Sequence, residues 1–173
     1  VDTLAKSTPE LIVSRYVDGG MQVISPDCAD PPFDDPNVRR AMMIGMDFQS
    51  YIDTVLLGNG IVNPFPSPGS PYHTPIEEMP EETAVLFSND KELARQMLEE
   101  AGYPDGFEIK GYFKPSAKLD TDCATWAEAE LAKIGIDVQV DKAEWGTFIG
   151  NVMDHNFDMS FYKEESDVPA ADV

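Results

Sequence analysis

The sequence predicts an α/β domain built around a mixed β-sheet that contains a parallel β-α-β-α-β unit. Three segments, 107–113, 136–140 and 157–161, alternate apolar with polar residues, which is the period of a strand with one covered face. Helical patterns over 117–134 and 145–154 separate these strands. Because successive parallel strands need a crossover connection, this order predicts parallel pairing through right-handed crossovers.

Two short strands are expected before this unit. Leu11–Tyr16 and Met21–Ile24 are apolar runs of strand length. The intervening Asp18-Gly19-Gly20 is a strong turn signal, because glycine adopts backbone conformations that other residues resist. These residues therefore predict a pair of strands at the start of the chain.

Two capped helices are expected between residues 31 and 58. Asp35 is placed to accept from free backbone N–H groups at the start of the first helix, and Pro36 suits the first helical turn. Asp47 is placed to start the second helix, and Gly58 to close it.

The segment 58–89 is dense in Pro, Gly and Ser, so we expect a long ordered loop without regular structure. The apolar spacing of the next segment predicts a helix over Asp90–Ala101, with Gly102 beyond its end. Tyr103–Gly106 then reads as a turn.

The methionines and tryptophans are expected to serve packing. Met42, Met43 and Met46 have helical spacing, and flexible methionine fills irregular space in a core. Trp126 and Trp145 are interpreted as core or rim anchors.

The charge balance excludes some classes of partner. Lys and Arg number 12 against 32 Asp and Glu, giving a formal net charge of -20. Such a surface repels phosphate backbones, so we expect no nucleic-acid partner. The sequence has no apolar run of transmembrane length, and residues 1–20 show no signal-peptide pattern.

Residues with catalytic or metal-binding chemistry do not form a recognisable pattern. His73 and His155 have no partner at metal-ligand spacing, and we interpret them as surface or loop histidines. Cys28 and Cys123 allow either one disulfide or two buried thiols. No nucleophile elbow is present. The sequence therefore predicts no enzyme, no metal site and no cofactor.

Five segments follow one another in an order that is specific to one family, and together they cover roughly residues 3–167. They are PPFDDPNVRRA (31–41), DFQSYIDTVLLGNG (47–60), NDKELARQMLEEAGYPDG (89–106), LAKIGIDVQV (131–140), and Glu144-Trp145 with Phe157-Asp158-Met159. In these segments the chain resembles the extracytoplasmic solute-binding proteins of peptide and nickel importers, the bacterial extracellular solute-binding proteins of family 5.

The resemblance implies that residues 1–173 form a single domain, the second (C-terminal) lobe of a larger receptor with a type II periplasmic-binding-protein fold. That receptor would have two lobes, a ligand between them, and about three times this length. Residues 1–30 would hold the hinge-proximal strands, with the chain crossing into the lobe near Met21–Asp27 and leaving near Asp167. The alternative is a self-sufficient domain that shares the lobe fold.

The resemblance also implies substrate-binding residues. Aligned through Phe157–Tyr162, the aspartate that pairs with a peptide's α-amino group in the family falls on Asp167, with Ser166 beside it. Pairing a buried ammonium with a carboxylate is chemically sensible. The family's Gly-Trp-Gly-like run is replaced by Lys163-Glu164-Glu165, so an exposed acid is the alternative for Asp167. Asp27 stands at the end of the hinge strand, where the family often has Phe-Asn.

The implied function is that of the substrate-binding component of an ABC importer, capturing oligopeptides or dipeptides. Its partners would be the solute, the first lobe of the same protein and a membrane permease. Its location would be periplasmic or extracellular, with a lipid anchor if the source has a single membrane. The alternatives are a ligand-sensing domain of a transcriptional regulator, or the same receptor fold binding nickel complexes, opines or oligosaccharides.

Overall fold

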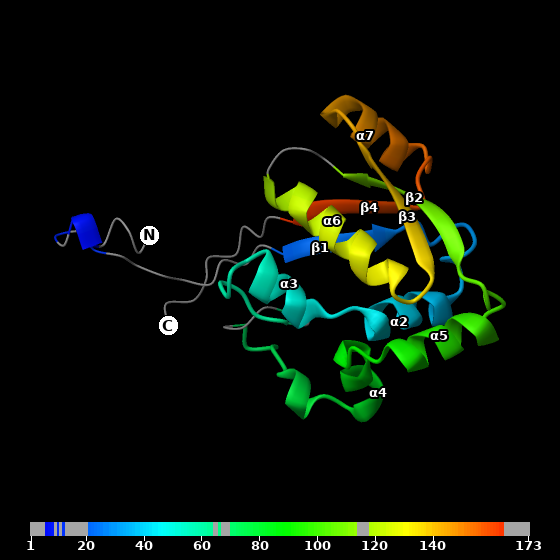
Figure 1. Cartoon of the computed structure of the whole chain (residues 1–173), viewed down its shortest axis with the longest axis horizontal. Coiled ribbons are helices and arrows are strands. Elements are labelled where there is room, and N and C mark those ends of the chain that lie inside the picture. Colours follow the sequence, from blue (N-terminus) through cyan, green and yellow to red (C-terminus); the bar gives the residue numbers. More distant parts are fainter. Residues whose placement is uncertain are drawn as a thin grey trace.

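The computed structural model describes residues 6–8, 10, 12, 21–63, 66, 70–113 and 118–164. These residues form a mixed four-stranded sheet with helices packed against it (Figure 1). The α/β class predicted from the sequence is confirmed.

The sheet has the order β1-β4-β2-β3. Strand β2 is parallel to both β3 and β4, which confirms the parallel unit, while β1 is antiparallel to β4. The antiparallel register sets Met21 opposite Glu164 and Pro26 opposite Met159. The strands are β1 (Met21–Pro26), β2 (Phe107–Phe113), β3 (Ile136–Lys142) and β4 (Met159–Glu164).

The two helices for which the sequence predicted caps begin at those residues, and a third helix has an aspartate cap as well. Side chains of Asp35, Asp47 and Asp90 each accept a hydrogen bond from a backbone N–H in the first turn of the helix that follows. The helices are α2 (Pro36–Gly45), α3 (Phe48–Thr54), α5 (Lys91–Glu100), α6 (Lys118–Ala132) and α7 (Trp145–Met153).

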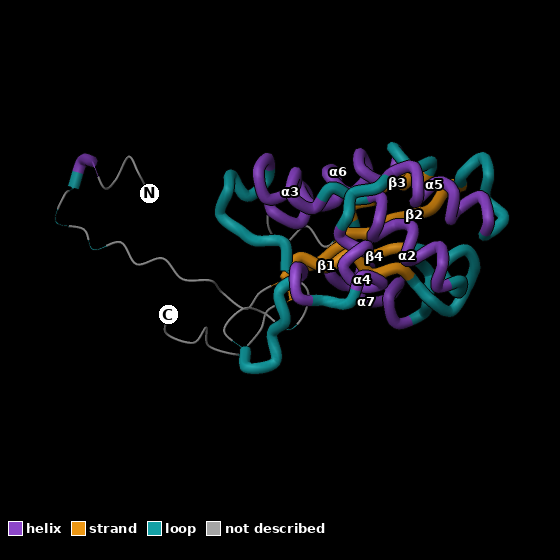
Figure 2. Tube along the Cα trace, turned by 90° about the horizontal axis from the view of Figure 1, so that it is seen from below, coloured by secondary structure: helices purple, strands orange, loops and turns teal. Residues whose placement is uncertain are grey.

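Helices α6 and α7 lie on opposite sides of the sheet (Figure 2). The chain moves outward from β2 to β3 through α6, then back across β2 to β4 through α7. Right-handed crossovers that run in opposite directions along a sheet place their helices on opposite faces, so this arrangement is the one that the handedness rule predicts.

The core lies between the sheet and helices α2, α5 and α6. It includes Ile109, Ile136 and Phe161 from the strands and Leu98 and Leu131 from the helices, each no more than 3% exposed. Alternation along the strands therefore identified the buried face correctly. Three methionines were predicted to pack in this region. Met42 and Met46 are buried, and Met43 is half-buried.

The Pro-rich segment differs from the prediction. It contains three short helical turns, η1 (Ile76–Glu78), α4 (Glu81–Ala84) and η2 (Val85–Phe87), where a loop without regular structure was expected. Pro75 and Pro80 occupy the N-cap positions of the first two. Proline is tolerated at a helix start because no backbone N–H is needed there, so these prolines begin turns that the prediction treated as excluded.

Two predicted element boundaries also change. Helix α3 ends at Thr54, before the predicted Gly58, and β4 begins at Met159, after the predicted Phe157. All of the predicted strand Leu11–Tyr16 except the exposed Ile12 lies outside the described residues. Both cysteines are free thiols, as the two-thiol alternative has them, but only Cys123 is buried; Cys28 is exposed, where that alternative expected burial.

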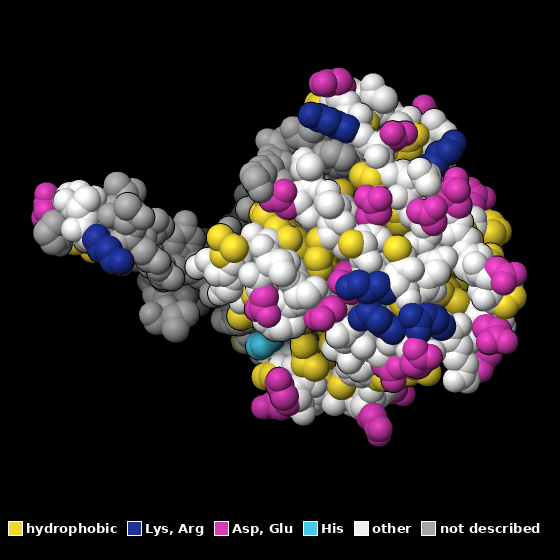
Figure 3. Space-filling view, in the orientation of Figure 1, with side chains coloured by type: hydrophobic (Ala, Val, Ile, Leu, Met, Phe, Trp, Pro, Cys, Tyr) yellow, Lys and Arg dark blue, Asp and Glu magenta, His cyan; other side chains and the backbone are white. Residues whose placement is uncertain are grey.

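The surface charge is dispersed. On the face shown in Figure 3, acidic side chains are spread over the surface, and Lys and Arg side chains gather in its middle and near its upper edge.

One buried carboxylate, Glu130, is paired with Lys91 and Lys133 and accepts a hydrogen bond from the backbone of Asp47 at 3.3 Å. A buried charge is tolerated when it is paired in this way, so Glu130 ties α3 and α5 to α6.

Candidate functional site

The strongest candidate for a ligand site is the carboxyl edge, the edge of the sheet where the parallel strands end. Strands β2, β3 and β4 finish there at Phe113, Lys142 and Glu164, and β1 begins there at Met21. Ligands of open α/β sheets bind in the crevice outside the carboxyl ends of the strands. The same edge is where the described sheet is entered at Met21 and left at Glu164, side by side.

A buried polar pair stands beside this edge. Gln22, the second residue of β1, donates from Nε2 to Oδ1 of Asp120 at 3.2 Å. Asp120 lies in the first turn of α6 and is 2% exposed. A carboxylate is stabilised at a helix N-terminus by the helix dipole, so the sequence can keep this charge buried. The carbonyl oxygen Oε1 of Gln22 is buried and has no hydrogen-bond partner among the described residues.

Helix α3 packs against α6 next to the turn of α6 that carries Asp120. Tyr51 and Cys123 are buried in a small cluster, and the indole Nε1 of Trp126 donates to the hydroxyl of Ser50 at 2.9 Å. Burial raises the pKa of the Cys123 thiol to about 12 and raises the pKa of Tyr51 above its ordinary value. Both groups therefore stay protonated near neutral pH, which suits packing and gives no activated nucleophile.

Asp27, a predicted substrate-binding residue, lies at the opposite edge. It follows the last residue of β1, and its backbone N–H donates to the carbonyl of Asp158, just before β4, at 2.8 Å. Its carboxylate accepts from the backbone N–H of Ala29 at 3.0 Å and pairs with Nδ1 of His155 at 2.8 Å. The hydrogen bond from Ala29 has the largest effect, and it lowers the pKa of the Asp27 carboxyl. The contact with His155 lowers this pKa as well, while burial opposes both.

The surroundings of Asp27 form a small polar hollow of about 200 Å³. Lys110 and Asp158 also line it, and the backbone N–H of Lys110 donates to Oδ2 of Asp158 at 2.7 Å. Two contacts of Asp27, with His155 and with the carbonyl of Asp158, tie the end of β1 to the turn before β4, and the third, from Ala29, is local. The arrangement is that of a structural clasp.

The other predicted site residues, Ser166 and Asp167, lie outside the described residues. They follow Glu164 in the sequence, the residue at which β4 reaches the carboxyl edge. The six residues of β4, at about 3.3 Å each, separate that edge from the clasp at Asp27. The structure therefore holds Asp27 at the ends of the strands opposite to Glu164, the last described residue before Ser166 and Asp167 in the sequence.

Sequence reasoning missed Gln22 and Asp120. A signal existed for each: Gln22 is a polar residue inside an apolar strand, and Asp120 is an acid at the start of a helix. Their contact spans 98 positions of the chain, so only the fold shows that the two residues meet.

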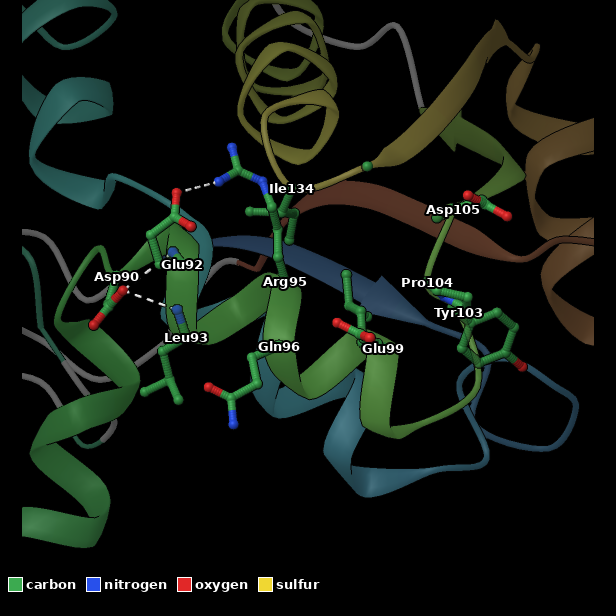
Figure 4. Close-up of a pocket in the computed structure, with 13 residues that line it drawn as sticks. Asp90, Glu92, Leu93, Arg95, Gln96, Glu99, Tyr103, Pro104, Asp105 and Ile134 are labelled. Atoms are coloured by element: carbon green, nitrogen blue, oxygen red, sulfur yellow. Dashed lines mark hydrogen bonds and ion pairs between the residues drawn. The ribbon is translucent and has the colours of Figure 1, made fainter.

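A larger open groove, of about 750 Å³, lies along α5 at the amino ends of the strands. Figure 4 shows Glu92 and Arg95 paired across its rim and Asp90 capping the helix. Arg95 also donates to the carbonyl of Lys133 at 2.6 Å. Asp90, Glu92 and Arg95 are engaged with one another or with the backbone, and the groove lies away from the carboxyl edge, so we do not assign it the ligand.

Within the described part of the chain, no three His, Cys, Asp or Glu side chains gather where they could hold a metal ion. Among the same residues, no helix has the length and apolar character needed to cross a bilayer. His73 bonds through Nδ1 to the carbonyl of Pro66 at 2.9 Å, so both histidines have partners other than a metal.

Comparisons of sequence point to one family. The family described as "Bacterial extracellular solute-binding proteins, family 5 Middle" matches residues 2–172 of the chain. Heme-binding protein A of Haemophilus influenzae is 30% identical over 156 residues, which cover 86% of this chain and 27% of that protein. The dipeptide-binding protein of Pseudomonas aeruginosa is 33% identical over 127 residues, covering 68% of this chain and 22% of that protein.

Solved structures agree. The dipeptide binding protein of Pseudoalteromonas sp. SM9913, in complex with Met-Leu, matches with a TM-score of 0.76 and 26% identity, over 97% of this chain and 33% of that one. DppA of Helicobacter pylori, in complex with the peptide STSA, matches with a TM-score of 0.73 and 25% identity, over 98% of this chain and 32% of that one. The chain thus spans about a third or less of the length of these relatives. With its sequence matched from end to end and its sheet matched to the same kind of receptor, the chain belongs to the bacterial extracellular solute-binding proteins of family 5.

Proposed function

We propose that this chain is one lobe of the substrate-binding component of an ABC importer, which captures dipeptides or oligopeptides between two lobes. The observation that carries the proposal is the coincidence of two features at the carboxyl edge. Ligands of this class of sheet bind at that edge, and the chain enters the sheet at Met21 and leaves it at Glu164 there. A connection to a second lobe at that point would place the ligand between the lobes.

Peptides are the favoured solute because relatives named as dipeptide-binding proteins match this chain in sequence and in structure. In this proposal Asp167 supplies the carboxylate for the α-amino group of the peptide, and Ser166 lies beside it. A carboxylate compensates the cost of burying an ammonium group, which fits ligands with a free amino terminus.

Heme is the second candidate, since heme-binding protein A matches most of the chain. His155 lies at the amino ends of the strands and pairs with Asp27, and His73 bonds to the carbonyl of Pro66. Both contacts use Nδ1 and leave Nε2 available, so the histidines do not decide between the two solutes.

The remaining parts of the proposal concern the whole protein. The complete receptor, meaning the polypeptide that extends this chain to the length of its relatives, would contain the first lobe and deliver its solute to a membrane permease. It would act in the periplasm or at the cell surface, lipid-anchored in a bacterium with one membrane. It would bind its solute without converting it chemically.

The test is calorimetric titration of the complete receptor with dipeptides and short oligopeptides. Asp167→Ala is expected to abolish binding, because the ligand ammonium loses its partner. Asp27→Ala is the matched control: it removes a carboxylate at the opposite edge and should leave the Kd within about twofold where the protein stays folded. Unchanged affinity in Asp167→Ala would remove that assignment, and tight hemin binding without peptide binding would replace peptide with heme.

A further inference from the structure

Helix α7 exposes an apolar stripe. Trp145, Ile149 and Met153 stand at successive four-residue steps, so they share one side of the helix. Their exposed fractions are 53%, 38% and 75%. Phe148 is the residue of α7 that is buried, and Trp145 stacks on it at 6.0 Å between ring centroids. Most of the apolar surface of α7 is therefore turned away from the core.

The composition of α7 is unusual for a helix with this much exposure. Its nine residues, WGTFIGNVM, include no charged side chain, in a protein with a net charge of -20. Surface helices carry charged and polar residues on the side that meets water, and contiguous exposed apolar surface marks a contact. The side chains of α7 fit a second protein surface better than they fit solvent.

Two glycines adjoin the stripe. Gly146 and Gly150 lie inside the helix, and a Cβ added at either would meet no atom within 4 Å. Glycine weakens a helix interior relative to alanine, and the described structure contains no close neighbour that requires it. Small residues one turn apart do let another backbone approach closely. The glycines therefore indicate a helix packed against this side of α7.

The surface around α7 leaves room for such a helix. Its side of the sheet is only partly covered, since the strand residues that alternate with the buried ones are exposed, while parallel strands are normally covered on both faces. These exposed residues are Glu108 and Lys110 on β2 and Asp137 and Gln139 on β3. Figure 1 shows α7 at the periphery of the fold, beyond β3.

We propose that the α7 face, made of Trp145, Gly146, Ile149, Gly150 and Met153, docks an apolar helix from another part of the same receptor polypeptide. The inference rests on the proposed function, in which this chain is part of a longer receptor. The chain spans 27% of heme-binding protein A and 33% of the dipeptide-binding structure, so most of the polypeptide of such a receptor remains to be packed. An intramolecular helix would cover the stripe permanently, which suits apolar residues in an otherwise acidic protein.

The test asks whether Gly150→Ala changes Tm in opposite directions in the 173-residue chain and in the complete receptor. Because its core is assembled within this chain, the 173-residue chain can be compared with the complete receptor. In the chain, Gly150→Ala strengthens α7 and should raise Tm by about 2–4 °C. In the complete receptor the added methyl group blocks the docked helix, and Tm should fall. Asn151→Ala, on the opposite side of α7 from the docking face, is the control and should act with the same sign in both.

Two results would overturn the inference. One is a Tm that rises in both proteins on Gly150→Ala, which would leave α7 facing solvent in the receptor. The other is dimerisation of the complete receptor that Met153→Lys abolishes, which would make a second copy the occupant. Peptide titration of the same samples keeps the two proposals apart, because loss of peptide binding beside a retained reversal of sign would refute the function alone.

Discussion

The close approach of Gly106 and Gly135 gives a sharp prediction about the sheet. Gly106 has φ +74°, and a Cβ there would lie 1.9 Å from the carbonyl oxygen of Gly135. The two glycines precede β2 and β3, and the N–H of Phe107 donates to that same carbonyl at 3.1 Å. Gly106→Ala must therefore part the amino ends of the two strands as well as adopt a left-handed backbone.

The expected loss combines these effects. The left-handed conformation costs about 1–2 kcal/mol for a residue with a Cβ, and the displaced hydrogen bond and strand contacts bring the total to about 3–4 kcal/mol. For a domain of this size Tm falls by about 2–4 °C per kcal/mol, so the loss is roughly 6–16 °C. Circular dichroism during heating measures it.

Gly102→Ala is the matched control. Gly102 has φ +97° but open space around the position of a Cβ, so the conformational cost alone remains. The control should lose about 1–2 kcal/mol. Equal losses in the two variants would show that the contact with Gly135 does not hold β2 to β3.

Three further predictions concern single residues. The pKa of Asp27 is lowered below 3.8, first by the N–H of Ala29, so its contribution to stability is present above that value and is lost as the pH falls through the folded pKa. Asp27→Asn should therefore show a flatter loss of Tm below about pH 4, and an unchanged acid slope would contradict this. Cys28 should react with a thiol reagent in the native protein and the buried Cys123 only after unfolding; equal rates would refute the assigned burial. Phe161→Ala empties a site that is 0% exposed and should cost about 3–5 kcal/mol in urea unfolding, and a loss below about 1 kcal/mol would contradict its place in the core.

Local signals in the sequence predicted most of the fold. Asp47 caps α3 as predicted, and alternation through Ile109 and Ile136 marks the buried face, because caps and periodicity depend on neighbouring residues. Boundaries were less certain. The backbone turns left-handed at both Leu57 and Gly58, and the N–H of Gly58 closes on the carbonyl of Ile52, so α3 ends before the glycine that signals its end.

The candidate site was harder to predict because it depends on register. Nothing local in the sequence says that Asp27 meets His155, which lies 128 positions away, or that β1 runs antiparallel to β4. That direction decides which end of β1 reaches the carboxyl edge. It brings Met21 opposite Glu164 and places Asp27 at the other ends of the strands, next to the start of β4. The resemblance supplied Asp167, whereas the fold alone supplied the position of Asp27.

The most direct test of the proposed half-site compares peptide binding by this chain and by the complete receptor in the same calorimeter. If the ligand lies between two lobes, the complete receptor binds short peptides and the isolated chain gives no measurable heat at the same concentrations, because one wall of the site is absent. Micromolar binding of peptides by the isolated chain would contradict the proposal and make this lobe a receptor in its own right.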